Sequence, residues 1–366
     1  MIKEGRIGVF EAIALITVMS NTKVFLSSPR VLVEKMGTAA WYGTMVSALT
    51  ALAGFYLVYL LVKRFNGREL GEIFESVFGR VLGSLLLLII GAYFALNAAL
   101  ISRETVEAAK AYFYPMSPPS FMLMVLILAV ITLLIYGLEG IARAAALFAL
   151  PILTALVVIL VFAIPLYEPA NLMPVLGHGP VNTLLIGMSR SSGYAEVVAL
   201  AVFLGALQGM GHFKKAGIIS LIISGLIVGS SMFFYIMAFP VNVAVENTNP
   251  LLNMTRVIEY GRFFQRFESI FLFAWSISAI LAVGISLYIT LSIYAKVFRI
   301  DDHRVLVLPL AVVLFNIAIL PRDLSSLVYI YVAAIREFGW AVAFGLPVLT
   351  LLVAVVRGKK GGPAGA

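Results

Sequence analysis

Long uncharged runs dominate the pattern of hydrophobic and polar positions along this chain. Each run is close to or longer than the roughly 17–25 residues that cross about 30 Å of hydrocarbon as an α-helix. The runs without Asp, Glu, Lys or Arg cover 36–62, 81–102, 111–138, 144–167, 216–245, 269–295, 305–321 and 338–356. The pattern therefore predicts an all-α integral membrane protein.

Two further segments, about 7–34 and about 181–208, are apolar but interrupted by polar or charged residues. With them the chain is expected to form ten transmembrane helices in a single transporter-like domain, 1–356. The predicted spans cover roughly 7–34, 38–62, 81–102, 118–137, 141–165, 181–208, 214–239, 265–295, 304–321 and 327–356.

Lysine and arginine are concentrated in one set of the predicted loops. Placing the N-terminus in the cytoplasm puts more than half of the 26 basic residues on the cytoplasmic side, as the positive-inside rule expects. An even number of spans then brings the C-terminus to the same side. Residues 357–366 are predicted to form a flexible cytoplasmic tail.

Composition supports the membrane class and excludes several others. Charged residues make up 12% of the chain, whereas soluble domains have about 25%. The net charge of +8 is explained by the basic loops, so no nucleic-acid partner is expected. The chain contains no cysteine, which excludes disulfides, thiolate catalysis and cysteine-based metal sites.

The sequence also lacks the motifs of an intramembrane enzyme. It contains neither His-Glu-x-x-His nor Gly-x-Ser-x-Gly, and its three histidines fall in predicted loops. We therefore expect no catalytic residue, cofactor or metal. The histidines are His178, His212 and His303.

Only the first and the sixth predicted spans are broken by polar residues. The breaks read VMSNTK at 18–23 and GMSRSSGYAE at 187–196. They lie five spans apart, as expected if 7–165 and 181–356 are two copies of one unit. Five spans per copy would invert the second copy in the membrane. Interrupted segments at matching positions of inverted repeats indicate the midplane site of a transporter.

A broken membrane helix exposes main-chain groups that can bind a charged ligand. Free N–H groups attract a carboxylate, and unwound carbonyls attract an ammonium group. This pair of partial charges suits a zwitterionic amino acid. The alternative is that the polar side chains only hydrogen-bond between helices, but two matching breaks favour a ligand site. Its predicted residues are Ser20, Asn21, Thr22, Ser191, Ser192, Gly193 and Tyr194.

Charged residues inside the predicted spans need a partner or water, because a charge at the bilayer centre costs at least about 2.5–3.5 kcal/mol. Glu196, about one turn after the sixth break, is predicted to be a protonatable coupling carboxylate. Lys23 would replace a sodium ion or pair with Glu196, or it is a fixed counter-ion between two helices. Arg336 and Glu337 are candidates for coupling, with a static ion network as the alternative. Arg190 lies near the sixth break.

Three further residues are weaker candidates for ligand contacts. Tyr93 and Asn97 share one face of the third span at i, i+4, and Trp275 lies in the eighth. Ordinary packing is the alternative for each of them.

Two features are expected outside the hydrocarbon. The segment 249–269 alternates apolar and basic residues and predicts an interfacial amphipathic helix. Charges at the outer end of the third span are predicted to be solvated. They are Arg103, Glu104, Glu107 and Lys110.

Three segments carry a resemblance to a known family. RFESIFLFAWSIS (266–278), GYAEVVALAVF (193–203) and NLMPVLGHGP (171–180) resemble the corresponding regions of spore germinant receptor B subunits. The resemblance covers essentially the whole chain. It implies a LeuT-like fold of the amino acid–polyamine–organocation superfamily, with a 5+5 inverted repeat and discontinuous helices 1 and 6.

The resemblance also implies a function. Such a subunit recognises a small nutrient, usually an amino acid, beside A- and C-type partner subunits in the spore inner membrane, and Glu196 would belong to the ligand or coupling region. The first break, SNTK (20–23), lacks the Gly-Ser-Gly turn of many superfamily members. Lys23 is therefore an alternative means of holding a ligand carboxylate.

Two functions remain open from the sequence. One is a ligand-sensing receptor subunit, and the other is a proton-coupled amino-acid transporter. Both require the same pocket, since a ligand acts through its differential affinity for two states.

Overall fold

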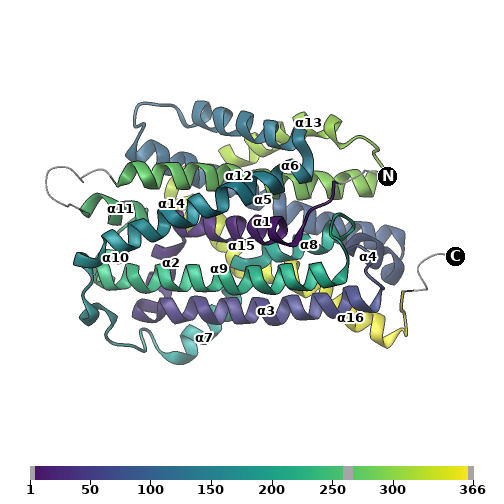
Figure 1. Ribbon diagram of the computed structural model, residues 1–366, viewed down its shortest axis with the longest axis horizontal. Helices are drawn as coiled ribbons and strands as arrows, with labels where there is room; N and C mark the ends of the chain where they lie inside the picture. Colours follow the sequence, from purple (N-terminus) through teal and green to yellow (C-terminus); the bar gives the residue numbers. More distant parts are fainter. Residues whose placement is uncertain (1–4, 259–266, 362–366) are drawn as a thin grey trace.

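The computed structural model describes residues 5–258 and 267–361 of the chain. Helices make up nearly all of these two ranges, and no β-strand occurs within them. The long helices run side by side along the longest axis of the molecule (Figure 1). The predicted all-α class is confirmed.

The described helices fall into long, apolar helices and short connecting ones. Two 3-10 segments, η1 (Thr22–Phe25) and η5 (Arg190–Val198), interrupt the first and sixth predicted spans, and two π-helical segments join α14 to α16. The α-helices are α1 (Val9–Asn21), α2 (Ser28–Met36), α3 (Ala40–Arg64), α4 (Leu70–Phe78), α5 (Arg80–Tyr112), α6 (Pro119–Phe162), α7 (Pro180–Ser189), α8 (Ala199–Val202), α9 (Met210–Ala238), α10 (Val241–Ala244), α11 (Pro250–Val257), α12 (Glu268–Phe298), α13 (Val307–Ile319), α14 (Leu324–Ser326), α15 (Ala333–Trp340) and α16 (Leu346–Val356).

Six helical stretches in the described ranges are long and apolar enough to cross a membrane. They cover 28–64, 80–112, 119–162, 210–238, 268–298 and 324–356. Each of them overlaps at least one predicted span: 28–64 includes the end of the first span and the second, and 119–162 includes most of the fourth and the fifth. The apolar stretch 303–319 is shorter. The total of ten spans stays a prediction.

The longest helix, α6, contains a break at Gly137. A straight helix of its 44 residues would be about 66 Å long, more than twice the roughly 30 Å of hydrocarbon. Gly137 has φ 71° and ψ −171°, which is not helical and is rarely adopted by residues with a side chain. The two parts of α6 therefore correspond to the predicted spans 118–137 and 141–165.

The first predicted span is broken as expected. α1 ends at Asn21, η1 forms one tight turn, and Leu26 is extended at φ −109° and ψ −159° before α2 begins. Pro29 lies in the first turn of α2, where its missing N–H costs nothing. The polar residues before it compete for backbone hydrogen bonds and disfavour a continuous helix.

The sixth predicted span is broken as well. α7 ends at Ser189, the nine residues of η5 are 3-10 helical, and α8 has only four residues. Almost every side chain of η5 is buried. The prediction of discontinuous helices 1 and 6 is confirmed.

The two broken segments lie in the centre of the bundle. α1 packs against α6, α9 and α12, and η5 packs against α3 and α15. Large apolar side chains such as Leu49, Leu128 and Ile222 are exposed on the surrounding helices. A bundle with a buried, polar centre and an apolar outer surface suits a lipid environment.

Contacts near α4, α8 and α16 join the inner and outer helices at one end of the molecule (Figure 1). Lys296 Nζ donates to Glu69 Oε2 and to the carbonyl oxygen of Val202, both at 2.9 Å. The amide of Ile7 donates to the carbonyl of Ala206 at 3.0 Å. These bonds connect the start of the chain, the end of the sixth span and the end of α12.

The tail that the sequence predicted to be flexible is held in its described part. The amide of Gly361 donates to the carbonyl of Arg64, and Lys359 Nζ donates to the carbonyl of Ser76 at 2.7 Å. The remaining tail residues, 362–366, lie outside the described ranges.

The predicted solvation of the charges at the end of the third span is wrong for two residues. Arg103 and Glu104 are 7% and 5% exposed. Arg103 pairs with Glu107 at 2.7 Å, and Glu104 accepts a hydrogen bond from Ser27. The turn before α2 covers this part of α5, which the sequence pattern could not indicate. For the predicted interfacial helix, α11 covers 250–257, and residues 259–266 lie outside the described ranges.

Candidate functional site

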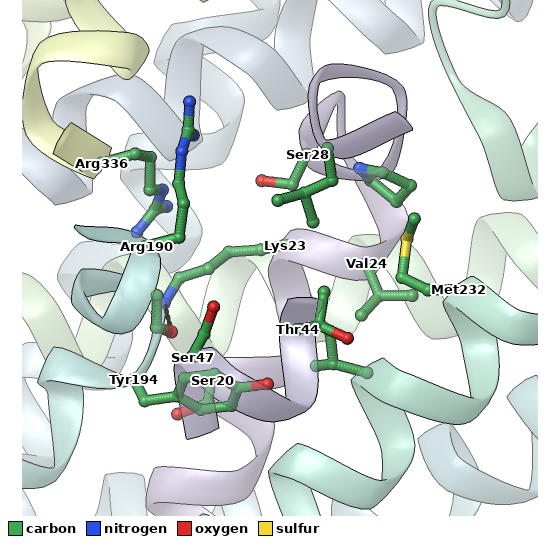
Figure 2. Close-up of a pocket in the computed structure, with 14 residues that line it drawn as sticks. Ser20, Lys23, Val24, Ser28, Thr44, Ser47, Arg190, Tyr194, Met232 and Arg336 are labelled. Carbon is green, nitrogen blue, oxygen red and sulfur yellow. Dashed lines mark hydrogen bonds between the residues drawn. The ribbon is translucent and has the colours of Figure 1, made fainter. Parts of the chain in front are cut away.

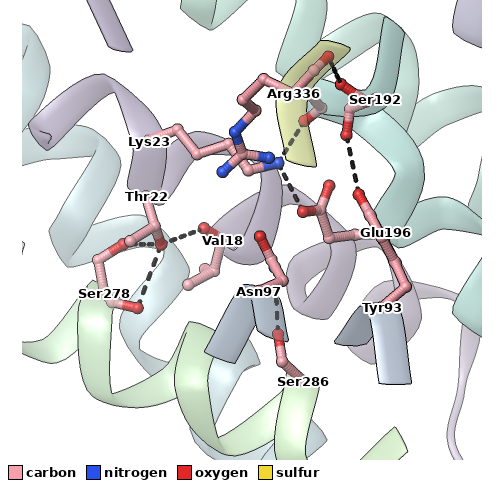
Figure 3. A network of polar contacts seen from close by, with 11 residues as sticks. Val18, Thr22, Lys23, Tyr93, Asn97, Ser192, Glu196, Ser278, Ser286 and Arg336 are labelled. Atoms are coloured by element: carbon pink, nitrogen blue, oxygen red, sulfur yellow. Dashed lines mark hydrogen bonds and ion pairs between the residues drawn. The ribbon is translucent and has the colours of Figure 1, made fainter. Parts of the chain in front are cut away.

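An ion pair connects the two broken segments. Lys23 Nζ, from η1, lies 2.5 Å from Glu196 Oε1, from η5 (Figure 3). The two side chains are 7% and 0% exposed. The same ammonium group donates to the main-chain carbonyl of Gly193. An amine from the first break therefore occupies the place that the unwound carbonyls of the sixth span offer to a cation.

A cavity lies beside this ion pair, between the broken segments and helices α2, α3 and α9 (Figure 2). Its volume is about 60 Å³, room for a few water molecules and less than the roughly 300–1,000 Å³ of small-molecule sites, so ligand binding requires a wider conformation of the same cavity. Figure 2 shows Lys23, Arg190 and Arg336 on one side and Val24 and Met232 on the other. The lining thus combines cationic and apolar surfaces, as a site for a small amphiphilic ligand requires.

The two arginines of the cavity are buried and only partly partnered. Arg190 Nη2 lies 3.6 Å from Glu337 Oε1, and the same oxygen accepts a hydrogen bond from Lys35. Nε and Nη2 of Arg190, and Nε and Nη1 of Arg336, have no hydrogen-bond partner among the described residues. Glu337 therefore belongs to an ion network with Lys35 and Arg190. Arg336, by contrast, forms no ion pair within 4.0 Å among the described residues.

Hydrogen bonds hold the sixth break against the neighbouring helices (Figure 3). Ser192 Oγ donates to the carbonyl oxygen of Arg336 at 2.5 Å, which connects η5 to α15. Tyr93 OH donates to the carbonyl of Ser192 at 3.4 Å, which connects η5 to α5. Since these bonds use main-chain oxygens, they fix the backbone of the break and leave the Arg336 side chain free to face the cavity.

The first break is held in a similar way. Thr22 Oγ1 donates to the carbonyl of Val18 at 2.8 Å and lies 2.6 Å from the hydroxyl of Ser278 on α12. Beside it, Asn97 Nδ2 donates to Ser286 Oγ at 3.5 Å, connecting α5 to α12. Both breaks are thus fixed by polar contacts within the bundle.

The structure brings only part of the predicted site to the cavity surface. Ser20, Lys23, Gly193, Tyr194 and Arg336 line it. The other predicted residues are near the breaks but do not line it, and their contact with a ligand stays a prediction. They are Asn21, Thr22, Tyr93, Asn97, Ser191, Ser192, Glu196, Trp275 and Glu337.

Trp275 illustrates the packing alternative. Its ring lies 6.0 Å from that of Phe271 and 6.3 Å from that of Phe113, measured between centroids. The side chain is 2% exposed and its Nε1 has no hydrogen-bond partner among the described residues. The contacts of this ring are those of a core aromatic residue.

Several cavity residues were missed by the sequence reading. All of them except Val24 come from α2, α3 and α9, whose sequences carry little sign of a site. The one available signal is Thr44 and Ser47, small polar residues at i, i+3 on one face of α3. The missed lining residues are Val24, Ser28, Pro29, Leu32, Thr44, Ser47, Val228 and Met232.

Comparison with known sequences gives the family. The sequence model of a family described as spore germination protein matches residues 6–326. The chain belongs to this family. Among curated relatives, spore germination protein KB of Bacillus subtilis (strain 168) is 25% identical over 312 residues, which cover 84% of this chain and 83% of that protein. Spore germination protein A2 of the same organism is 23% identical, covering 85% and 86%.

Solved structures similar to this chain are those of transporters. A substrate-bound, outward-open sodium-coupled sialic acid symporter matches with a TM-score of 0.67 and 13% identity, over 95% of this chain and 78% of the symporter. MhsT in complex with L-phenylalanine matches with a TM-score of 0.65 and 14% identity, over 98% and 91%. These likenesses confirm that the chain has the LeuT-like fold expected from its sequence.

Proposed function

We propose that this chain is the membrane subunit of a spore germinant receptor that binds a small nutrient, an amino acid, in the mid-membrane cavity and signals germination. The observation that carries the proposal is the Lys23–Glu196 ion pair, which joins the two helix breaks beside the cavity. Membership of the spore germination family supports the germination role.

Signalling requires that the ligand favours one of two conformations of the protein. The cavity is lined by both broken segments and by α2, α3, α9 and α15. A ligand that contacts them unequally in two states shifts the balance between those states. Lys23, Glu196, Arg336 and Glu337 are the proposed coupling residues, since they connect the first, sixth and tenth predicted spans.

We place the protein in the spore inner membrane, with both termini in the cytoplasm and A- and C-type receptor subunits as partners. The start of the described chain and the end of α16 lie at the same end of the molecule (Figure 1), which supports termini on one side. The two proposed repeats, 7–165 and 181–356, form one domain around the cavity.

The alternative function is a proton-coupled amino-acid transporter, which would use the same cavity. Uptake of labelled amino acids into proteoliposomes under a proton gradient separates the two functions. A pure sensor gives no accumulation above that of empty liposomes, and gradient-dependent accumulation would favour the transporter.

Binding itself is tested with a panel of amino acids and the purified protein in lipid nanodiscs. We expect at least one amino acid to raise the thermal unfolding midpoint, and Lys23→Ala to weaken that effect. If no amino acid shifts the midpoint of the wild-type protein, the proposal fails.

A further inference from the structure

The cavity lining has an unusual balance of charge. Three cations, Lys23, Arg190 and Arg336, face it, and none of its lining residues is a carboxylate. A buried cation without a counter-ion is costly, by several kcal/mol in real proteins. Each of the three must therefore obtain its counter-charge from behind the lining or from a ligand.

Two of the cations have a counter-charge within the protein. Lys23 is paired with Glu196 at 2.5 Å. Arg190 lies 3.6 Å from Glu337, which Lys35 also contacts. Both are thus at least partly neutralised.

Arg336 differs from the other two. Among the described residues it forms no ion pair within 4.0 Å, although it is only 4% exposed. Its Nε and Nη1 atoms have no hydrogen-bond partner among the described residues. Its side chain points from α15 to the side of the cavity that Lys23 occupies (Figure 2). Each of these free N–H groups can donate to an anionic oxygen, and the unpaired guanidinium charge favours a carboxylate as the ligand group beside it.

Lys23 already occupies two of the acceptors that could hold a ligand's ammonium group. Lys23 Nζ takes both the Gly193 carbonyl and Glu196 Oε1. An ammonium group entering the cavity would have to displace this amine or use a remaining oxygen. Ser20 Oγ, Asn21 Oδ1 and Glu196 Oε2 have no hydrogen-bond partner among the described residues, but of these three residues only Ser20 lines the cavity. A ligand's carboxylate can therefore bind the free donors of Arg336, whereas its ammonium group meets acceptors that Lys23 partly occupies.

We propose that Arg336 anchors the carboxylate of the ligand, so that the site selects small aliphatic carboxylates and depends less on their amino group. The inference rests on the proposed function and specifies its substrate class. The aliphatic part of the ligand would lie against Val24, Leu32, Val228 and Met232, the apolar side of the lining.

The test uses three matched sets of probes on the full chain in nanodiscs. Each set contains an L-amino acid, its amide and the acid without the amino group: alanine, alaninamide and propionate, and the corresponding sets for valine and leucine. Affinities are measured by thermal shift for the wild type, Arg336→Gln and Arg336→Lys. The matched control is Arg103→Gln, because Arg103 is also buried but is paired with Glu107 away from the cavity.

In at least one set, we expect the wild type to bind the amino acid about 10- to 100-fold more tightly than its amide. This factor corresponds to the free energy of hydrogen bonds to a charged group. Removing the amino group of the ligand is expected to lower its affinity less than converting the carboxylate to an amide. Arg336→Gln should lower the ratio of acid to amide affinity to about one. Arg336→Lys should retain part of the wild-type ratio, because lysine keeps the positive charge but not the planar guanidinium group.

A purely structural role of Arg336 predicts a different result. It predicts a lower unfolding midpoint of ligand-free Arg336→Gln with an unchanged acid-to-amide ratio, which is the behaviour expected of Arg103→Gln. An unchanged ratio in Arg336→Gln would overturn the anchor while amino-acid binding, and with it the proposed function, still stands. If no amino acid or acid binds the wild type, both the anchor and the proposed function are wrong.

Discussion

Lys23 Nζ and Glu196 Oε1 lie 2.5 Å apart although 173 positions separate them in the chain. Both side chains come from segments that have lost their α-helical hydrogen bonds, η1 and η5. The ion pair is thus the direct contact between the two helix breaks, and its energetics decide how firmly the breaks are held together.

Breaking this pair should destabilise the protein strongly. Lys23→Met or Glu196→Gln alone leaves a buried group without its partner and is expected to cost about 3–5 kcal/mol of unfolding free energy. The double variant should be close to neutral, because no unpaired charge remains. Denaturant titration of the four proteins measures the coupling. Glu139→Gln is the control, since the Arg143–Glu139 pair is exposed and should cost less than about 1 kcal/mol. Additive single effects would contradict a coupled pair.

The proposed coupling role of Glu196 predicts a pH-dependent affinity. If the carboxylate exchanges a proton when ligand binds, the thermal shift produced by an amino acid changes between about pH 5 and 8 in the wild type. Glu196→Gln cannot titrate and should bind with an affinity that is constant over this range. The same pH dependence in both proteins would remove Glu196 from the coupling role.

Close helix packing is tested at Gly217 on α9. A Cβ atom at this position would lie 2.0 Å from the ring of Phe55 on α3. Because the ring is buried, Gly217→Ala should force α3 and α9 apart and cost about 1–3 kcal/mol. Gly211 on the same helix has no atom within 4 Å of a built Cβ. Gly211→Ala should therefore be neutral or slightly stabilising in the same unfolding assay, and equal losses in both variants would contradict the packing of α3 on α9.

Asp323, at the start of the last helical stretch and outside the membrane, should make the stability of the protein depend on pH. The amide of Ser326 donates to Asp323 Oδ1 at 2.7 Å, and this hydrogen bond holds the pKa of the Asp323 carboxyl below its usual range. A lowered folded-state pKa means that the stabilisation is present above the unfolded pKa and is lost as the pH falls through the folded value. Asp323→Asn should keep the helix cap but lose this acid-side dependence, measured as the unfolding midpoint against pH. An unchanged profile would contradict it.

Much of the fold could be predicted from the sequence because the membrane imposes simple rules. Uncharged runs of bilayer length gave α3, α9 and α12 with boundaries correct to a few residues, whereas α5 continues to Tyr112, well beyond the predicted end at 102. The two breaks were visible because Ser20–Lys23 and Arg190–Gly193 interrupt apolar sequence. The Gly137 bend within α6 also separates the two predicted spans where they were expected.

The cavity surface was harder to predict. Lys23 and Glu196 can be recognised as site candidates because they are charged residues in apolar segments. Val228 and Met232, by contrast, resemble any lipid-facing residue in sequence. Burial depends on which face of α9 packs against its neighbours, and a uniformly apolar helix does not reveal this. The predicted solvent exposure of Arg103 and Glu104 was wrong for a similar reason, because the segment that covers them is distant in the chain.

The most direct test of the central account uses the absence of cysteine from the chain. Ser47→Cys places a single thiol in the cavity lining, and Ser224→Cys places one at a buried position of α9 that does not line the cavity. A small, water-soluble anionic thiosulfonate should label the first variant and not the second, and a bound amino acid should slow that labelling. Equal resistance of both thiols, or labelling of Ser47→Cys that no amino acid slows, would contradict a ligand cavity between the two broken helices.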